Sequence, residues 1–103
     1  MIIEVTKKSE FEDILANNNF VIVDFWAPWC GSCRMLMPVI KQIEDELPEL
    51  TVAGINVDEL QEISSQYDIQ SIPTLVLFRD HAEVASHNGF ASSQALIDWI
   101  KEN

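Results

Sequence analysis

A run of consecutive apolar residues, Phe20-Val21-Ile22-Val23, constrains the fold of this chain more than any other feature. The run is rich in β-branched side chains and has no polar residue on either face, so it predicts a strand buried on both sides. Such strands are typical of parallel pairs in a sheet that is covered by helices on both faces. The run therefore favours an α/β fold.

The rest of the chain alternates between strand-like and helix-like patterns. Strands are expected at residues 2–5, 20–23, 50–57, 74–78 and 83–86, and helices at 9–16, 33–47, 61–67 and from Ser92 or Ser93 onward. Ser9 and Glu12 predict a capping box at the first helix, and Pro38 predicts a kink in the long helix. This order implies an α/β fold with a central mixed β-sheet of about five strands flanked by about four helices. The length suits a single domain over residues 1–103.

The charge of the chain limits its partners. Seventeen acidic residues against six basic ones give a formal net charge of −11. Such a surface repels phosphate backbones and anionic lipids, which argues against nucleic acid and membranes as partners. No stretch is long enough for a transmembrane helix, and the N-terminus lacks the pattern of a secretory signal, so a cytoplasmic location is expected.

The cysteines, Cys30 and Cys33, are separated by Gly31 and Ser32 at the start of an expected helix. A bridge across so short a loop constrains the unfolded chain little, so the pair points to chemistry rather than to stability. The unpaired amides and partial positive charge of a helix N-terminus stabilise a thiolate. We therefore expect Cys30 to be a nucleophile with a lowered pKa, and Cys33 to attack a mixed disulfide formed on Cys30.

A zinc site is the main alternative for a Cys-x-x-Cys pair. Zinc takes four ligands in structural sites. The only histidines, His81 and His87, lie far along the chain on or near an expected hairpin. The ligand count therefore disfavours zinc, and we expect no metal.

Asp24 directly follows the apolar run and is expected to be buried with it. Burial disfavours the charged form of a carboxyl group and raises its pKa. A carboxyl group that titrates near neutral pH suits acid–base work. A solvated position at the edge of the strand is the alternative.

The segment 24–34, D-F-W-A-P-W-C-G-S-C-R, resembles the active-site signature of the thioredoxin family. The resemblance continues through Pro38, Val57-Asp58, Ser71-Ile72-Pro73-Thr74 and Gly89. It implies the thioredoxin fold and a thiol–disulfide oxidoreductase that reduces protein disulfides. It also implies that the chain works as a monomer without a cofactor. Its disulfide is then expected to be reduced by a thioredoxin reductase, an NADPH-dependent flavoprotein. The chain has no Gly-rich dinucleotide motif of its own.

The resemblance also assigns roles to single residues. Pro73 matches a cis-proline beside the cysteine pair, and Asp24 matches a proton acceptor for Cys33. The catalytic residues are thus expected to be Cys30, Cys33 and Asp24, and the substrate-binding residues Trp29, Gly31, Ser32, Ile72, Pro73, Gly89 and Phe90.

The sequence departs from common bacterial members of that family at several positions. Gly54 stands where they carry a lysine near the aspartate, so we expect a still higher pKa for Asp24. Ser32 replaces a proline, and its hydroxyl could donate to the Cys30 thiolate and weaken the protein as a reductant. Phe90 replaces a small residue beside the expected groove. An oxidase or isomerase of the same fold and a non-catalytic binding module both remain open.

Overall fold

The computed structural model describes residues 1–103 and contains the helices and strands in the predicted order. The strands are β1 (Ile3–Glu4), β2 (Phe20–Trp26), β3 (Thr51–Asn56), β4 (Thr74–Arg79) and β5 (Ala82–Asn88). The helices are α1 (Lys8–Asn17), α2 (Gly31–Glu46), α3 (Gln61–Gln66) and α4 (Ser93–Glu102). None of these helices is long and apolar enough to cross a membrane.

The strands form one mixed sheet in the order β1-β3-β2-β4-β5. β3 pairs in parallel with β1 and β2, whereas β4 pairs antiparallel with β2 and β5. β2 is buried from Val21 to Phe25, as its apolar run predicts. The expected mixed sheet of about five strands and about four helices is therefore confirmed.

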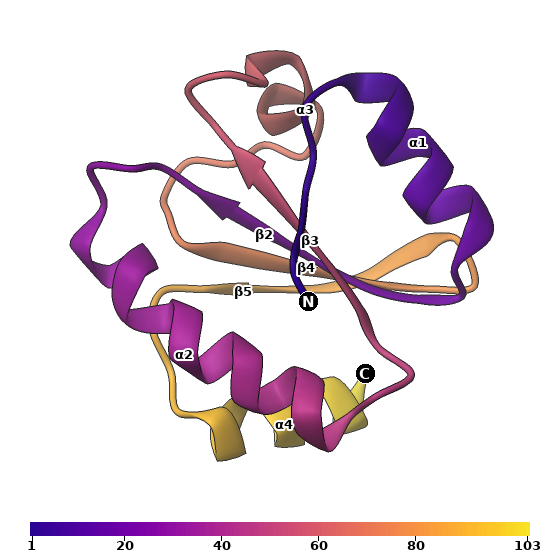
Figure 1. Ribbon diagram of the computed structural model, residues 1–103, viewed down its shortest axis with the longest axis vertical. Coiled ribbons are helices and arrows are strands. Elements are labelled where there is room, and N and C mark those ends of the chain that lie inside the picture. The colour runs from indigo at the N-terminus through magenta and orange to yellow at the C-terminus, as the bar shows by residue number, and fades with distance from the viewer.

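Helices cover both faces of the sheet, with α1 and α3 on one side and α2 and α4 on the other (Figure 1). Successive side chains of β2 alternate between these layers. Val21, Val23 and Phe25 pack in the core that includes α1 and α3, while Ile22 packs in the core that includes α2 and α4. The same alternation directs Asp24 toward the α2 layer.

The predicted cap of the first helix is wrong. α1 begins at Lys8, its N-cap Lys7 has no side-chain hydrogen bond, and Ser9 lies inside the helix. Glu10 reaches back instead, accepting hydrogen bonds from the Thr6 backbone N–H at 2.7 Å and the Thr6 hydroxyl at 2.6 Å. Several neighbouring acidic residues can supply the capping carboxylate, and the local geometry decides which of them does. The spacing alone therefore selected the wrong pair.

Two other helix features refine the sequence expectations. α2 begins at Gly31 rather than near Cys33, and it continues past Pro38 to Glu46. Of the two candidate caps for α4, Ser92 is the N-cap, and its hydroxyl accepts the Ala95 backbone N–H at 3.2 Å.

Candidate active site

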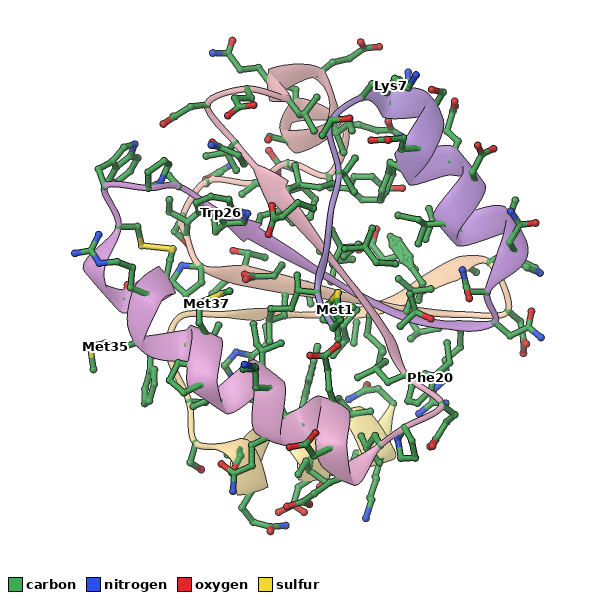
Figure 2. The ribbon with its side chains drawn as sticks, in the orientation of Figure 1. Met1, Lys7, Phe20, Trp26, Met35 and Met37 are labelled. Atoms are coloured by element: carbon green, nitrogen blue, oxygen red, sulfur yellow. A yellow bond between two sulfur atoms is a disulfide. The ribbon has the colours of Figure 1, made fainter.

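Cys30 and Cys33 form a disulfide at the N-terminal end of α2, visible as the sulfur–sulfur bond in Figure 2. The Cα atoms of the two residues are 5.3 Å apart. Cys30 is the N-cap of the helix, and Cys33 lies in its first turn. Both residues are buried, Cys30 at 7% and Cys33 at 3% exposure, so the residue expected to act first is the more exposed of the two.

The first turn of α2 places hydrogen-bond donors around Cys30 Sγ. The Cys33 backbone N–H donates to this sulfur at 3.2 Å, and the Ser32 hydroxyl oxygen lies 3.4 Å from it. The amides of a helix N-terminus also concentrate partial positive charge at this position. When the disulfide is reduced, this environment favours a thiolate on Cys30.

Trp29 stands beside the disulfide with 68% of its surface exposed. Its indole Nε1–H donates to the Asp58 carboxylate at 2.9 Å. This bond fixes the orientation of a large exposed aromatic ring. Sequence reasoning assigned no role to Asp58, although it lay within the Val57-Asp58 pair that carried part of the resemblance.

The segment around Pro73 lies against the same sulfur. The Ile72–Pro73 peptide bond is cis, as the resemblance implies, and the Ile72 carbonyl oxygen is 3.9 Å from Cys30 Sγ. Gly89, at φ +85°, donates its backbone N–H to the Pro73 carbonyl at 2.8 Å. Ile72 and Trp29 both line a small surface pocket of about 150 Å³.

The structure thus gathers most of the predicted site residues around Cys30. Contacts to Cys30 or to each other join Ser32, Ile72, Pro73 and Gly89. Trp29 precedes Cys30 in the chain and lines a pocket with Ile72, and Gly31 opens the helix. Phe90 follows Gly89 and is 46% exposed, but none of the contacts above ties its side chain to the disulfide.

Asp24 is buried inside β2 at 1% exposure, and its Oδ1 has no hydrogen-bond partner. Desolvation by burial, together with repulsion from the Glu4 carboxylate, raises its pKa to about 7. The predicted burial and the direction of the pKa shift are confirmed, and the solvated alternative is wrong.

Glu4 is a residue of this region that sequence reasoning missed. It pairs with Gly54 across β1 and β3, and Gly54 pairs with Asp24 across β3 and β2. The Glu4 carboxylate lies over Gly54, only 2.6 Å from where a Cβ of residue 54 would stand. Where the resemblance places a lysine, this chain therefore presents an acidic group from the neighbouring strand. Only the pairing register reveals this, because Glu4 and Asp24 are far apart in the sequence.

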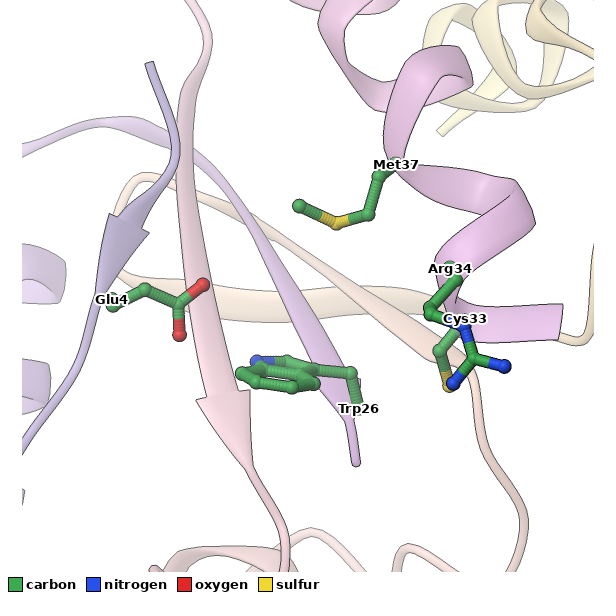
Figure 3. Close-up of a pocket in the computed structure, with 5 residues that line it drawn as sticks. All are labelled: Glu4, Trp26, Cys33, Arg34 and Met37. Atoms are coloured by element: carbon green, nitrogen blue, oxygen red, sulfur yellow. The ribbon is translucent and has the colours of Figure 1, made fainter. Parts of the chain in front are cut away.

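A cavity of about 280 Å³ connects this acidic group to the cysteine pair. It is lined by Glu4, Trp26, Cys33, Arg34 and Met37 (Figure 3). The Trp26 indole nitrogen points toward the Glu4 carboxylate in this view. Burial raises the pKa of Glu4, and the Trp26 indole N–H lowers it in part.

The histidines lie away from the cysteine pair. His81 Nδ1 is 2.6 Å from the Leu15 carbonyl oxygen, and the His87 ring packs against Trp99 with 5.5 Å between ring centroids. No three or more His, Cys, Asp or Glu side chains are grouped so that they could hold a metal ion. The geometry therefore gives no support to the zinc alternative.

The sequence of this chain is similar to those of known thioredoxins. The family model described as Thioredoxin matches residues 2–102. A thioredoxin from Rickettsia bellii is 43% identical over 100 residues, which is 96% of this chain and 95% of that protein. A thioredoxin from Chlamydia pneumoniae is 38% identical, with 98% of each chain covered. The chain also matches a bifunctional thioredoxin reductase/thioredoxin from Mycobacterium leprae at 43% identity, over 92% of this chain and 21% of that one.

Solved structures give the same result. A mutant thioredoxin from Halobacterium salinarum superimposes with a TM-score of 0.91 at 38% identity, covering 98% of this chain and 88% of the other. Oxidised mitochondrial thioredoxin 3 from Saccharomyces cerevisiae gives a TM-score of 0.90 at 29% identity, covering 99% and 95%. The chain therefore belongs to the thioredoxin family, and it is a thiol–disulfide oxidoreductase with the Cys30–Cys33 disulfide as its redox-active centre.

Proposed function

We propose that Cys30 is the nucleophile that opens the disulfide of a protein substrate. Its reduced sulfur attacks one sulfur of the substrate, so that a Cys30–substrate disulfide forms and the other substrate sulfur leaves as a thiolate. The observation that carries this proposal is the hydrogen bond from the Cys33 backbone N–H to Cys30 Sγ at the start of α2. Such a donor stabilises a thiolate more than a thiol.

Cys33 completes the exchange in a second step. Its thiol loses a proton, its sulfur attacks Cys30, and the Cys30–Cys33 disulfide forms as the second substrate sulfur leaves. The two electrons of the dithiol have then moved to the substrate. Asp24 is the proposed proton acceptor, because its buried carboxyl group has a pKa of about 7 and so binds and releases a proton at neutral pH.

The substrate chain is proposed to dock beside Cys30. The backbone of Ile72, next to the cis-Pro73, would pair with an extended substrate segment, and the exposed Trp29 ring would pack against it. Gly31, Ser32, Gly89 and Phe90 would complete the binding surface. The close approach of the Ile72 carbonyl to Cys30 Sγ supports this arrangement.

The reduced state is proposed to be restored by a thioredoxin reductase, an NADPH-dependent flavoprotein. The Mycobacterium leprae relative supports a reductase as partner, because its name joins both activities in one protein. We further propose that residues 1–103 act as one domain, as a monomer and in the cytoplasm, without binding nucleic acid or membranes. The net charge of −11 supports the last point.

Reduction of insulin by dithiothreitol tests the proposed mechanism. The protein is expected to accelerate the appearance of insulin turbidity, and Cys30→Ser is expected to abolish the acceleration. Alkylation of the reduced Cys33→Ser variant should give a thiol pKa well below that of free cysteine. An ordinary, slowly alkylated thiol at Cys30 would contradict the assignment. Equilibration of the cysteine pair with glutathione then separates a reductant from an oxidant of the same fold.

A further inference from the structure

Two carboxyl groups lie in one row of the sheet with only a glycine between them. Glu4, Gly54 and Asp24 occupy matching positions on β1, β3 and β2, and matching residues of parallel neighbours point to the same face. Gly54 has no side chain to separate the two acids. The Glu4 carboxylate fills the space above Gly54, on the side of the sheet that α2 covers.

The two acids differ in their access to Cys33 and to solvent. Asp24 is 1% exposed and does not line the cavity beside Cys33. Glu4 is exposed to solvent and lines that cavity together with Cys33. The cavity has a volume of about 280 Å³, which exceeds the roughly 30 Å³ that one water molecule takes in the liquid. Of the two acids, only Glu4 borders the cavity that Cys33 borders.

We propose that Glu4 is a second proton-carrying residue of the exchange reaction, linking Cys33 and Asp24 to solvent through this cavity. The inference rests on the proposed function of Cys30, Cys33 and Asp24 and extends it. As Cys33 attacks Cys30, its proton passes to the carboxyl pair, and Glu4 releases that proton to solvent. No redox partner beyond the substrate is required.

The charged groups around the two acids favour a proton on at least one of them. Repulsion from Glu4 raises the pKa of Asp24, and repulsion from Glu59 adds to the burial that raises the pKa of Glu4. The cation on the cavity wall is Arg34 of α2, and its guanidinium Nη1–H donates to the Pro28 carbonyl at 2.8 Å rather than to either acid. Repulsion between two carboxylates disfavours the state in which both are ionised.

The two steps can be timed separately with dithionitrobenzoate, a chromogenic aromatic disulfide. Attack by Cys30 releases one coloured thiolate, and attack by Cys33 on the mixed disulfide releases a second. Rapid mixing of the reduced protein should therefore give two phases, and Cys33→Ser should give only the first. Glu4→Gln removes the carboxylate while keeping the size of the side chain. Glu49→Gln is the matched control, because Glu49 is exposed and does not line the cavity.

Glu4→Gln is expected to slow the second phase at least about tenfold at neutral pH, a modest fraction of what a positioned acid–base group contributes, and to leave the first phase unchanged. Glu49→Gln should leave both phases unchanged, and Glu4→Asp should restore most of the second phase. A second phase in Glu4→Gln as fast as in the wild type would overturn the proposal, even if the titration of Asp24 moves. Failure of Glu4→Asp to restore the rate would also overturn it.

The same experiment separates this inference from the proposed function. A wild-type reaction without the fast first phase would contradict Cys30 as the nucleophile and say nothing against the folded site. Circular dichroism of each variant, compared with the wild type, shows that a lost phase does not reflect a lost fold.

Discussion

Asp24 is the residue whose ionisation couples the stability of the fold to pH. Its pKa is about 7 in the folded protein against 3.8 as the ordinary value, so the native state holds the proton more tightly than the unfolded chain. Stability from this group is therefore present below about pH 4 and is lost as the pH rises to about 7, by about 4 kcal/mol at most. Above that pH the loss stays constant.

Replacement of Asp24 by asparagine tests this linkage. Asp24→Asn is expected to gain stability relative to the wild type between about pH 4 and about pH 8, because the neutral amide removes the cost of a buried charge. Urea unfolding of the oxidised proteins at both pH values measures the difference, and Asp98→Asn on the exposed face of α4 serves as control. An Asp24→Asn variant with the pH dependence of the wild type would contradict the raised pKa.

Ser32 is expected to set the redox potential through its hydroxyl group, which lies 3.4 Å from Cys30 Sγ. A hydrogen bond to a thiolate stabilises the reduced form and makes the protein a weaker reductant. Ser32→Ala should therefore make the potential more negative, by up to about 30 mV or 1.4 kcal/mol. Equilibrium with glutathione measures the shift, and Ser32→Pro provides a second variant. Unchanged redox potentials in both variants would show that the Ser32 hydroxyl does not influence the potential.

At the scale of the elements, α3 ends in a Schellman motif that contains a strained residue. The Ile69 backbone N–H donates to the Ser64 carbonyl at 3.0 Å, and the Asp68 N–H donates to the Ser65 carbonyl at 3.1 Å. Asp68 has φ +54°, a left-handed conformation that glycine adopts without steric cost. The helix therefore ends with good hydrogen bonds on an unfavourable residue.

Asp68→Gly is accordingly expected to stabilise the protein by about 1 kcal/mol, measured by chemical denaturation. Asp68→Ala keeps the Cβ and its strain, so it should give no such gain. Equal stability of the glycine and alanine variants would show that the conformation at residue 68 carries no strain.

The element ends also show which features were readable from the sequence. The cap of α4 was predicted to be Ser92 or Ser93, and Ser92 is the N-cap, because its hydroxyl accepts the backbone N–H of the residue three positions further on. The cap of α1 was mispredicted because Glu10 and Glu12 offer similar carboxylates and only the three-dimensional turn selects Glu10. In both cases the sequence indicated a helix start, and the geometry of the first turn decided which neighbouring side chain makes the hydrogen bond.

At the scale of the whole molecule, acidic self-repulsion opposes folding. The net charge is −11, and the ion pairs are limited to Met1–Glu44 and Lys8–Glu62. The screening length is about 30 Å at 0.01 M salt, which exceeds the 12.4 Å radius of gyration, so most charges repel one another across the molecule. Added salt weakens this repulsion more than it weakens a few exposed ion pairs.

Raising NaCl from about 0.01 M to about 0.15 M is therefore expected to increase the thermal midpoint by about 5 °C, equivalent to about 1 kcal/mol. Calorimetry measures the change, and choline chloride at equal ionic strength tests whether sodium binding is responsible. A constant or lower midpoint would show that self-repulsion does not limit stability.

The site residues that could be predicted from the sequence lie close together in the chain, and those that could not be predicted lie far apart. Cys30, Cys33 and Asp24 lie within one short segment, whose resemblance to the thioredoxin signature grouped them. Glu4 and Asp58 enter the site through strand pairing and a contact between loops, respectively. Such contacts depend on how distant segments meet, and no local pattern encodes that meeting.

β1 consists of only two residues at the margin of the sheet, yet one of them, Glu4, is in register with the buried Asp24 across Gly54. Ile3 and Glu4 are both exposed and lie outside the apolar cores, so substitutions there leave the packing of the interior largely intact. Substitution of Glu4, in evolution or by design, thus changes the pKa of Asp24 while leaving the fold around the cysteines intact.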